Sequence, residues 1–238
     1  MRSAAAALAS AAVLAACAHA FAQPAEQGEL RGLKLGQVAT EMATDKFGEF
    51  ACGSNGSAPR EPLNGWGDFR KCRPEASGLR EVYVRYDDRE EYAARAANDL
   101  ALAERLAGTK VAGHPVILSV LFDDAGTVRM IRYVTDPRAP MDQRRFGHLL
   151  RLRILERYGS QGWTCADQPA EAGETPVGNI FIKQRCEKVQ PERRLVMQVR
   201  MLRKPGQTDY DPVTREYVPG QFESSTRLEI SDPTLPGG

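Results

Sequence analysis

Two stretches of the sequence present the same order of features, and each of them carries a pair of cysteines. In the first, Lys46-Phe47-Gly48 is followed by Cys52 and, after a loop, by Phe69-Arg70-Lys71-Cys72. In the second, Arg157-Tyr158-Gly159 is followed by Cys165, a loop and Phe181 to Cys186. In both, the aromatic-Gly pair is expected to end a helix and the later cysteine to lie on a basic strand. The pattern predicts two related units joined by a helix and a hairpin.

The four cysteines of these stretches can pair in three ways. The repeat favours Cys52–Cys72 and Cys165–Cys186, each closing a loop of about 20 residues and stabilising by about 3 kcal/mol on a chain-entropy estimate. The alternative is a metal site built from all four thiolates. Structural zinc sites take ligands from closely spaced C-x-x-C pairs, and the sequence contains none. We therefore expect two disulfides, no metal and no cofactor.

The first 22 residues have the pattern of a secretory leader. Arg2 supplies the positive end, and an apolar run too short to span a bilayer follows. Cleavage after Ala22 would release the protein into the periplasm, a compartment in which disulfides persist. The alternative is a lipobox, Leu14 to Cys17, which would make Cys17 the lipidated N-terminus of an outer-membrane lipoprotein. Residues 23–31 are expected to be a mobile lead-in, and no later run is long enough for a transmembrane helix.

The charge balance argues against nucleic acid as a partner. The chain has 32 Lys and Arg against 31 Asp and Glu, and removal of Arg2 with the leader makes the two counts equal. Binding to nucleic acid needs a concentrated basic surface, which a balanced chain does not supply overall.

Hydrophobic periodicity predicts an α+β fold, with antiparallel sheet, three packing helices and two related disulfide-stapled halves. The predicted helices span about 37–47, 89–107 and 141–158, and the predicted strands about 69–73, 81–86, 115–122, 127–134, 179–189, 194–203 and 222–231. The first half would cover 32–110, and the hairpin with the second half 111–231. Residues 232–238 are expected to be a flexible tail.

The entry Gly32-Leu33-Lys34-Leu35-Gly36-Gln37, followed by a short helix ending at Phe47-Gly48 and then by hairpins, resembles the SmpA/OmlA group. These are small helix-plus-antiparallel-sheet lipoproteins of the bacterial outer membrane that assist barrel assembly. The resemblance covers about 25 residues and the element order. It implies an envelope protein that works by contact, and no functional residue carries over from it.

Few residues offer catalytic chemistry. His114 and His148 are the histidines beyond the leader, and the sequence has no G-x-S-x-G motif, phosphate loop or dinucleotide fingerprint. Asp209 and Asp211 lack the glycine and distal glutamate of an EF-hand calcium loop. A surface or half-buried position is favoured for both histidines over a catalytic one.

Two groups of residues are candidates for a partner surface. Arg144, Arg145, Arg151 and Arg153 concentrate positive charge on one helix, which suits an anionic surface, although a solvated helix face explains them as well. Large aromatic residues anchor many protein interfaces, and Trp66, Phe69, Tyr210 and Tyr217 are candidates for that role. The alternative is that these aromatics close the ends of the sheet.

These observations favour an exported, non-enzymatic binding or assembly factor of the bacterial envelope, of the protein-partner or inhibitor type. Its partner would be an envelope protein or an anionic surface. The alternative is a small envelope hydrolase that uses His148 or His114 with a nearby carboxylate. Sequence alone does not identify the partner.

Overall fold

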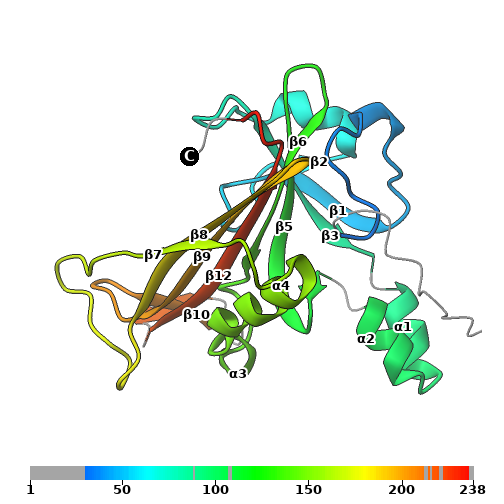
Figure 1. Cartoon of the computed structure of the whole chain (residues 1–238). Coiled ribbons are helices and arrows are strands. Elements are labelled where there is room, and N and C mark those ends of the chain that lie inside the picture. Colours follow the sequence, from blue (N-terminus) through cyan, green and yellow to red (C-terminus); the bar gives the residue numbers. More distant parts are fainter. Residues whose placement is uncertain are drawn as a thin grey trace, which may run out of the picture.

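The computed structural model describes residues 30–87, 89–106, 109–211, 214, 216–219 and 222–235, with only the backbone described at positions 90, 104–106, 209–211 and 217–219. An antiparallel sheet of ten strands dominates the described part (Figure 1). Its strand order is β2-β1-β3-β5-β6-β12-β9-β8-β7, and β4 pairs with one end of β5. The predicted leader and Cys17 lie outside the described residues.

The strands of this sheet are β1 Phe47–Cys52, β2 Pro62–Leu63, β3 Arg80–Tyr86, β4 Lys110–Val111, β5 His114–Phe122, β6 Val128–Thr135, β7 Thr164–Asp167, β8 Ile182–Gln190, β9 Arg193–Leu202 and β12 Glu223–Ser231. A second, two-stranded sheet pairs β10 Thr208–Asp211 with β11 Glu216–Pro219. The α-helices are α1 Arg89–Ala96, α2 Leu100–Leu106, α3 Met141–Arg144 and α4 Leu150–Tyr158. Three 3-10 helices are η1 Ala39–Glu41, η2 Trp66–Lys71 and η3 Gly147–Leu149.

The predicted strands along the centre of the sheet are confirmed. β5 and β6 form the predicted hairpin, closed at Asp123, whose carboxylate accepts hydrogen bonds from the backbone amides of Ala125 and Thr127 at 3.0 and 2.9 Å. β5 has apolar side chains on both faces and lies in the interior of the sheet, as its composition predicts. The predicted strands near 81–86, 179–189, 194–203 and 222–231 correspond to β3, β8, β9 and β12.

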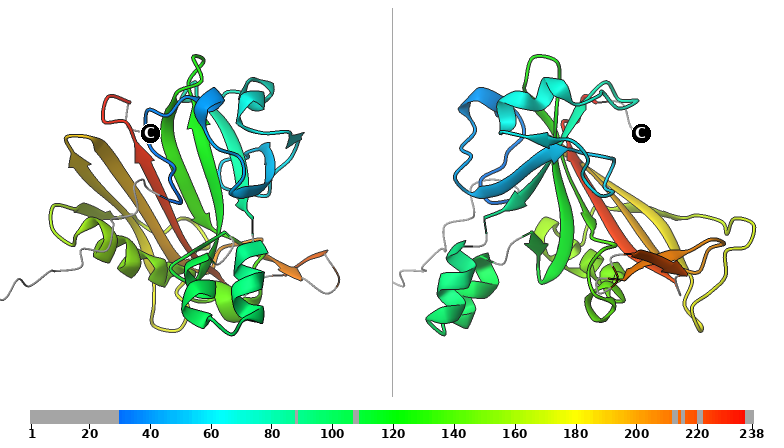
Figure 2. Two further views of the ribbon diagram at one scale, coloured as in Figure 1. Left: turned by 90° about the vertical axis from the view of Figure 1, so that its right-hand side faces the viewer. Right: turned by 180° about the vertical axis from the view of Figure 1, so that it is seen from behind.

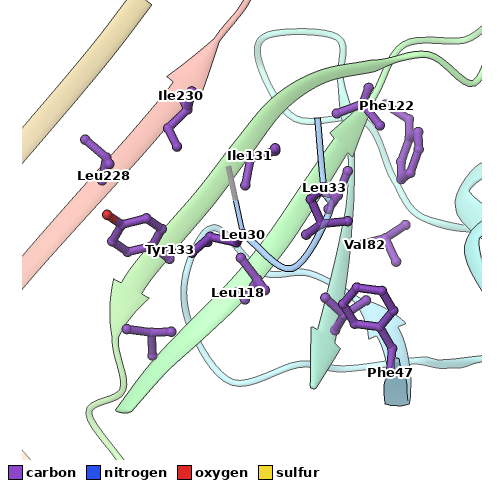
Figure 3. Packing of buried hydrophobic residues seen from close by; sticks show 14 of the residues in the cluster. Leu30, Leu33, Phe47, Val82, Leu118, Phe122, Ile131, Tyr133, Leu228 and Ile230 are labelled. Carbon is purple, nitrogen blue, oxygen red and sulfur yellow. The ribbon is translucent and has the colours of Figure 1, made fainter. Parts of the chain in front are cut away.

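Alternation along the strands gives the sheet two different faces. The helix-covered face carries apolar side chains, among them Leu118, Ile131 and Leu228, which pack together and against the segment that begins at Leu30 (Figure 3). α4 packs on the same face through Leu150, Ile154 and Tyr158, and in Figure 1 it crosses in front of the strands. The opposite face, called here the polar face, carries Tyr83, Ser119, Arg132, Arg185, Gln198, Arg227 and Glu229.

Both predicted disulfides are present. Cys52–Cys72 joins the end of β1 to the residue after η2, and Cys165–Cys186 joins directly opposed residues of β7 and β8. The four thiols are therefore used in pairs, which excludes the alternative of one metal site built from all of them.

The predicted helix at 37–47 is wrong. This segment contains η1 and a turn at residues 44–47, and Phe47 already begins β1. Its backbone is paired with the β5–β6 hairpin: the Ala39 amide donates to the Gly126 carbonyl, and the Gln37 carbonyl accepts from the Val128 amide. These tertiary hydrogen bonds use groups that a helix would have needed. The element that carried the resemblance to the SmpA/OmlA group is therefore absent from the described structure.

The predicted helix at 89–107 is two helices, α1 and α2. Asn98 has a φ of +58°, a left-handed conformation that ends α1, and the Asp99 carboxylate then caps α2 by accepting from the Leu102 amide at 3.0 Å. The pair packs mainly against itself and stands to one side of the sheet (Figures 1 and 2). Tyr92 of α1 and Leu100 of α2 are 79% and 63% exposed, so neither side chain packs on the sheet.

Two further predictions need correction. The helix predicted at 141–158 is divided into α3, η3 and α4, because Gly147 lies directly against β12. The strand predicted at 69–73 is replaced by η2. The two disulfides consequently lie in different surroundings, one between a strand and a 3-10 helix and the other between paired strands. Two related halves are not seen in the structure.

Candidate functional site on the polar face of the sheet

The strand register sets polar side chains in rows across the polar face. Arg185 of β8 lies opposite Gln198 of β9, which lies opposite Arg227 of β12, which lies opposite Val134 of β6. In the neighbouring row, Arg200 of β9 lies opposite Ser225 of β12. Side chains two residues apart on a strand share a face, so Arg200 and Gln198 are neighbours. Three arginines are thereby arranged around one glutamine.

A buried ion-pair network underlies one side of these rows. Arg132 of β6, 4% exposed, donates to both carboxylate oxygens of Glu75, at 2.7 and 3.0 Å, and to Glu229 Oε1 at 2.9 Å. Its Nη1 also lies 3.2 Å from Glu81 Oε1. Burial opposes ionisation of Arg132, but its hydrogen bond to Glu75 and the charges of Glu81 and Glu229 outweigh it and raise the pKa of Arg132. The guanidinium is therefore a fixed positive charge at the centre of three carboxylates.

Two carboxylates of this network, those of Glu75 and Glu229, have lowered pKa values. Burial raises the pKa of Glu75. The hydrogen bond and the charge of Arg132 lead the opposing contributions, and the net pKa is lowered from its usual value of 4.5. The pKa of Glu229 is lowered in the same way: burial is outweighed by the charges of Arg227 and Arg132. A network of this kind holds its members in fixed positions, because each buried charge has a hydrogen-bonding partner.

A loop after β1 is attached to the same network. Arg227 donates through Nη1 to the carbonyl of Asn55 at 3.0 Å and through Nη2 to Asn55 Oδ1 at 2.5 Å. The Asn55 amide donates to Glu81 Oε2 at 2.5 Å. Asn55 has a φ of +59° and Gly56 of +80°, which fits the turn that the Asn-Gly pair predicts. The loop therefore forms a wall beside Arg227.

Between this wall and β8 lies a polar hollow of about 440 Å³. It is lined by Asn55, Val134, Arg185, Gln198, Arg200, Glu223, Ser225, Arg227 and Glu229. Glu223 accepts from Lys204 Nζ at 2.7 Å and from Ser225 Oγ at 2.9 Å, and Arg200 lies 3.6 Å away. Burial raises the pKa of Glu223, but the hydrogen bond and charge of Lys204 lead the opposing contributions, and the net pKa is lowered.

The far side of the hollow is fixed by the loop between β7 and β8. Lys183, opposite Arg200 in the register, donates to Glu171 at 2.7 Å and to Glu174 at 2.9 Å. These two hydrogen bonds raise the pKa of Lys183. They also attach the loop to β8, so the side of the hollow facing β8 is held in place.

The lining decides which chemistry the hollow supports. Three arginines face two glutamates, so the lining carries a net charge of +1. Its hydroxyl group, Ser225 Oγ, donates to a carboxylate whose lowered pKa makes it a weak base. The hollow offers guanidinium and amide donors to an acidic or strongly polar group, in the size range of small-ligand sites.

The histidines form a separate site on the helix-covered face. His148 Nδ1 lies 3.0 Å from Ser224 Oγ, and Ser224 Oγ donates to the Arg145 carbonyl at 2.9 Å. Ser224 Oγ also accepts from the backbone amide of His148 at 3.1 Å, and its role toward the His148 ring depends on the tautomer of that ring. Ser224 is also buried. The pair therefore joins η3 to β12, and the Ser224 hydroxyl is also engaged by the Arg145 carbonyl.

Both histidines have lowered pKa values, for reasons that are not catalytic. Burial is the first cause for each, followed by the charge of Arg153 for His114 and of Arg151 for His148. His114 and His148 also repel each other. Among the described residues, no carboxylate is a cause of either shift.

The aromatic residues predicted for a partner surface have different positions. Trp66 is 1% exposed and Phe69 is also buried, which corrects their prediction as surface anchors. The Trp66 ring packs edge-on against Phe47 and Phe50, and its Nε1 donates to the Ala43 carbonyl at 3.0 Å. Tyr210 and Tyr217 are directly paired in β10 and β11, and their side chains lie outside the described residues.

The predicted arginines lie on or next to the helices of the covered face. Arg145 and Arg153 are exposed, and Arg144 and Arg151 are partly buried. The Arg145 guanidinium lies 4.6 Å over the Phe146 ring, and Arg144 donates to the Pro137 carbonyl at 3.0 Å. They are therefore on the opposite side of the sheet from the polar hollow.

The residues of the polar hollow were not identified from the sequence. A signal was present: in β12, Glu223, Ser225, Arg227 and Glu229 alternate with buried residues, and β9 shows the same alternation at Gln198 and Arg200. A period of two indicates one polar face. The period does not give the register between β9 and β12, and it is this register that places the polar residues of the two strands next to each other.

No family model, curated protein or solved structure matches this chain. Among the described residues, no group of three or more His, Cys, Asp and Glu side chains is placed to share a metal ion. No helix of the described part has both the length and the apolar character needed to cross a bilayer.

Proposed function

We propose that this protein is a non-enzymatic binding or assembly factor of the bacterial envelope, and that its polar hollow receives an acidic segment of a partner protein. The observation that carries the proposal is the arrangement of Arg185, Arg200 and Arg227 around Gln198. Side chains held in a fixed arrangement lose little further freedom when a ligand binds. The leader-like N-terminus and the two disulfides support an exported location.

The charge of the hollow is the reason for choosing an acidic segment. Arg227 is already neutralised by Glu229 at close range, whereas Arg200 is 3.6 Å from Glu223, and Glu223 is itself closely paired with Lys204. A ligand carboxylate beside Arg200 would complete its set of partners with a charge-assisted hydrogen bond. A basic ligand would meet the three guanidinium groups and be disfavoured.

Site-specific photo-crosslinking in cells tests this proposal. A photoreactive residue at Gln198, on the floor of the hollow, is expected to crosslink to one envelope protein. The same residue at Lys34, an exposed position elsewhere, is the matched control. Arg200→Glu should abolish the Gln198 crosslink, and Arg203→Glu, an exposed neighbour on the same strand's end, should leave it unchanged. Equal crosslinking from Gln198 and Lys34, or none from Gln198, would contradict the proposal.

The alternative function, a small envelope hydrolase, was expected to use His148 or His114 with a nearby carboxylate. In the structure, the side chain beside His148 is the Ser224 hydroxyl, 3.0 Å away. This alternative predicts that Ser224→Ala and His148→Ala each remove hydrolytic activity while the Gln198 crosslink is kept. The proposed function predicts that crosslinking and cellular phenotype survive both substitutions in folded protein. The two functions are therefore separated by the same pair of variants.

A further inference from the structure

The segment that runs from α3 to α4 concentrates positive charge. Residues 141–158 contain five arginines and two acidic residues, a net charge of +3, whereas the whole chain has a net charge of +1. The two acids are Asp142 and Glu156, and Glu156 is paired with Arg153 at 3.0 Å. Arg145, Arg153 and Arg157 are exposed. A locally basic surface is thus present on a chain that is neutral overall.

Two apolar side chains are exposed among these arginines. Phe146 is 43% exposed and Leu152 is 51% exposed. On α4, Leu150, Ile154 and Tyr158 are buried and face the sheet, so helical periodicity directs Leu152 outward. Phe146 lies just before η3, under the guanidinium of Arg145. Apolar and cationic groups therefore emerge together from the surface of one short segment.

A hollow of about 460 Å³ opens beside the same arginines, between α4 and the turn that joins β4 to β5. It is lined by Val111, Ala112, Tyr133, Arg153, Ile154, Glu156 and Arg157. Its lining combines apolar side chains with the two guanidinium groups of α4. This combination fits a ligand that carries an anionic group next to a hydrocarbon portion.

We propose that this surface, formed by Arg145, Phe146, Leu152, Arg153 and Arg157, docks the protein on an anionic phospholipid bilayer. Phe146 and Leu152 would enter the interfacial region, and the arginines would contact lipid phosphates. A bilayer fits better than an acidic protein, because the two apolar side chains stand singly among cations instead of forming the apolar centre of a protein interface.

The placement of the surface is consistent with the proposed function and independent of it. α4 covers one face of the sheet, and the polar hollow opens on the other. A protein docked through α4 would hold the polar hollow away from the lipid, where a partner protein can reach it. A variant that loses lipid binding therefore says nothing about the polar hollow. The hollow is tested separately, by the crosslink from Gln198.

Vesicle co-flotation tests the proposal directly. The chain carries Cys17→Ser in every sample, so no attached lipid contributes and all variants share one N-terminus. This protein, with no further substitution, is the wild type of the assay. It is expected to float with phosphatidylcholine vesicles that contain phosphatidylglycerol, and not with phosphatidylcholine alone. The bound fraction should fall as salt is raised, because charge attraction to the surface is screened.

Two matched pairs of variants locate the surface. Arg153→Gln with Arg157→Gln should weaken binding about 30-fold, since each arginine near an anionic surface contributes about fivefold. The control pair, Arg60→Gln with Arg73→Gln, replaces exposed arginines elsewhere and should not weaken binding. Phe146→Ser with Leu152→Ser should weaken binding at least about tenfold. Ile180→Ser with Val189→Ser, exposed apolar residues of similar accessibility, is its control.

Three outcomes would overturn the proposal once far-UV circular dichroism shows each variant folded. The first is wild-type protein that does not float with the anionic vesicles. The second is equal weakening by the control pairs. The third is binding of polyglutamate, without binding of vesicles, that depends on Arg153 and Arg157, because this result would assign the surface to an acidic protein.

Discussion

Arg132 holds Glu75 through two parallel hydrogen bonds, from Nη1 to Oε1 at 2.7 Å and from Nη2 to Oε2 at 3.0 Å. Glu75 lies outside the strands, and Arg132 lies on β6, so this pair fixes a connecting segment to the sheet. Bidentate pairing of this kind specifies geometry as well as charge. Because Arg132 also contacts Glu81 of β3 and Glu229 of β12, one side chain links the connecting segment and both strands on the polar face.

Arg132→Ala is expected to lower the free energy of unfolding by about 3–5 kcal/mol, because it leaves buried carboxylates without their partner. Guanidinium denaturation followed by circular dichroism measures the loss. Arg129→Ala is the matched control on the same strand, since its ion pairs with Asp123 and Asp232 are partly exposed and are worth about 1 kcal/mol or less. Similar losses for both variants would show that the network adds no stability.

The network also predicts acid sensitivity. The pKa values of Glu75 and Glu229 are lowered in the folded protein, so these groups contribute stability that is fully present above their usual value of 4.5. That contribution is lost as the pH falls through the folded pKa values. Thermal melts of wild-type protein should show the loss, and Glu75→Gln with Glu229→Gln should flatten it. An unchanged slope in the double variant would contradict the assignment.

Gly147→Ala is expected to destabilise the packing of η3 on β12. A Cβ at this position would lie 2.4 Å from the carbonyl oxygen of Ser224, a backbone atom that cannot turn away. Overpacking of this kind costs about 1–3 kcal/mol. Gly67→Ala is the control, because a Cβ there would have no neighbour within 4 Å. Melting temperatures of the two variants measure the difference.

Removal of the disulfides should affect stability unequally. The two bridges span 20 and 21 residues, so the chain-entropy contribution is similar, about 3 kcal/mol for each. Cys52 and Cys72 are both buried, whereas Cys165 is exposed. Replacing Cys52 and Cys72 by Ala should therefore cost more than replacing Cys165 and Cys186, because core packing is lost as well. Denaturant titrations of the two double variants give the comparison.

The parts of the fold that sequence predicted are those that local patterns determine. β5 and β6 were predicted because a long apolar run, a Gly-containing turn and a β-branched return specify a hairpin almost by themselves. The disulfides were predicted because two similar stretches each carry a pair of cysteines about 20 residues apart, and because the expected export favours bridges. Both kinds of feature are encoded within about twenty residues of sequence.

The errors arose where tertiary contacts override local preference. Residues 37–47 have helical spacing, but their backbone pairs with the β5–β6 hairpin at Gly126 and Val128. The polar hollow was missed because its residues come from β8, β9 and β12, and neither their pairing order nor their register can be derived from the periodicity of each strand. For Trp66 both positions had to stay open, because an aromatic residue in a Gly-rich loop can either cover a core or be exposed on a surface.

The borders of the ten-stranded sheet have a consequence for the protein at high concentration. One border is β2, two residues long and beginning with Pro62, which has no amide hydrogen to donate. The other is β7, four residues held against β8 by a disulfide. Long unpaired strands recruit further strands and start aggregation. Such short borders leave little template for a second molecule. Reduction of the outer disulfide would release β7 and uncover residues 184–187 of β8, with which it pairs.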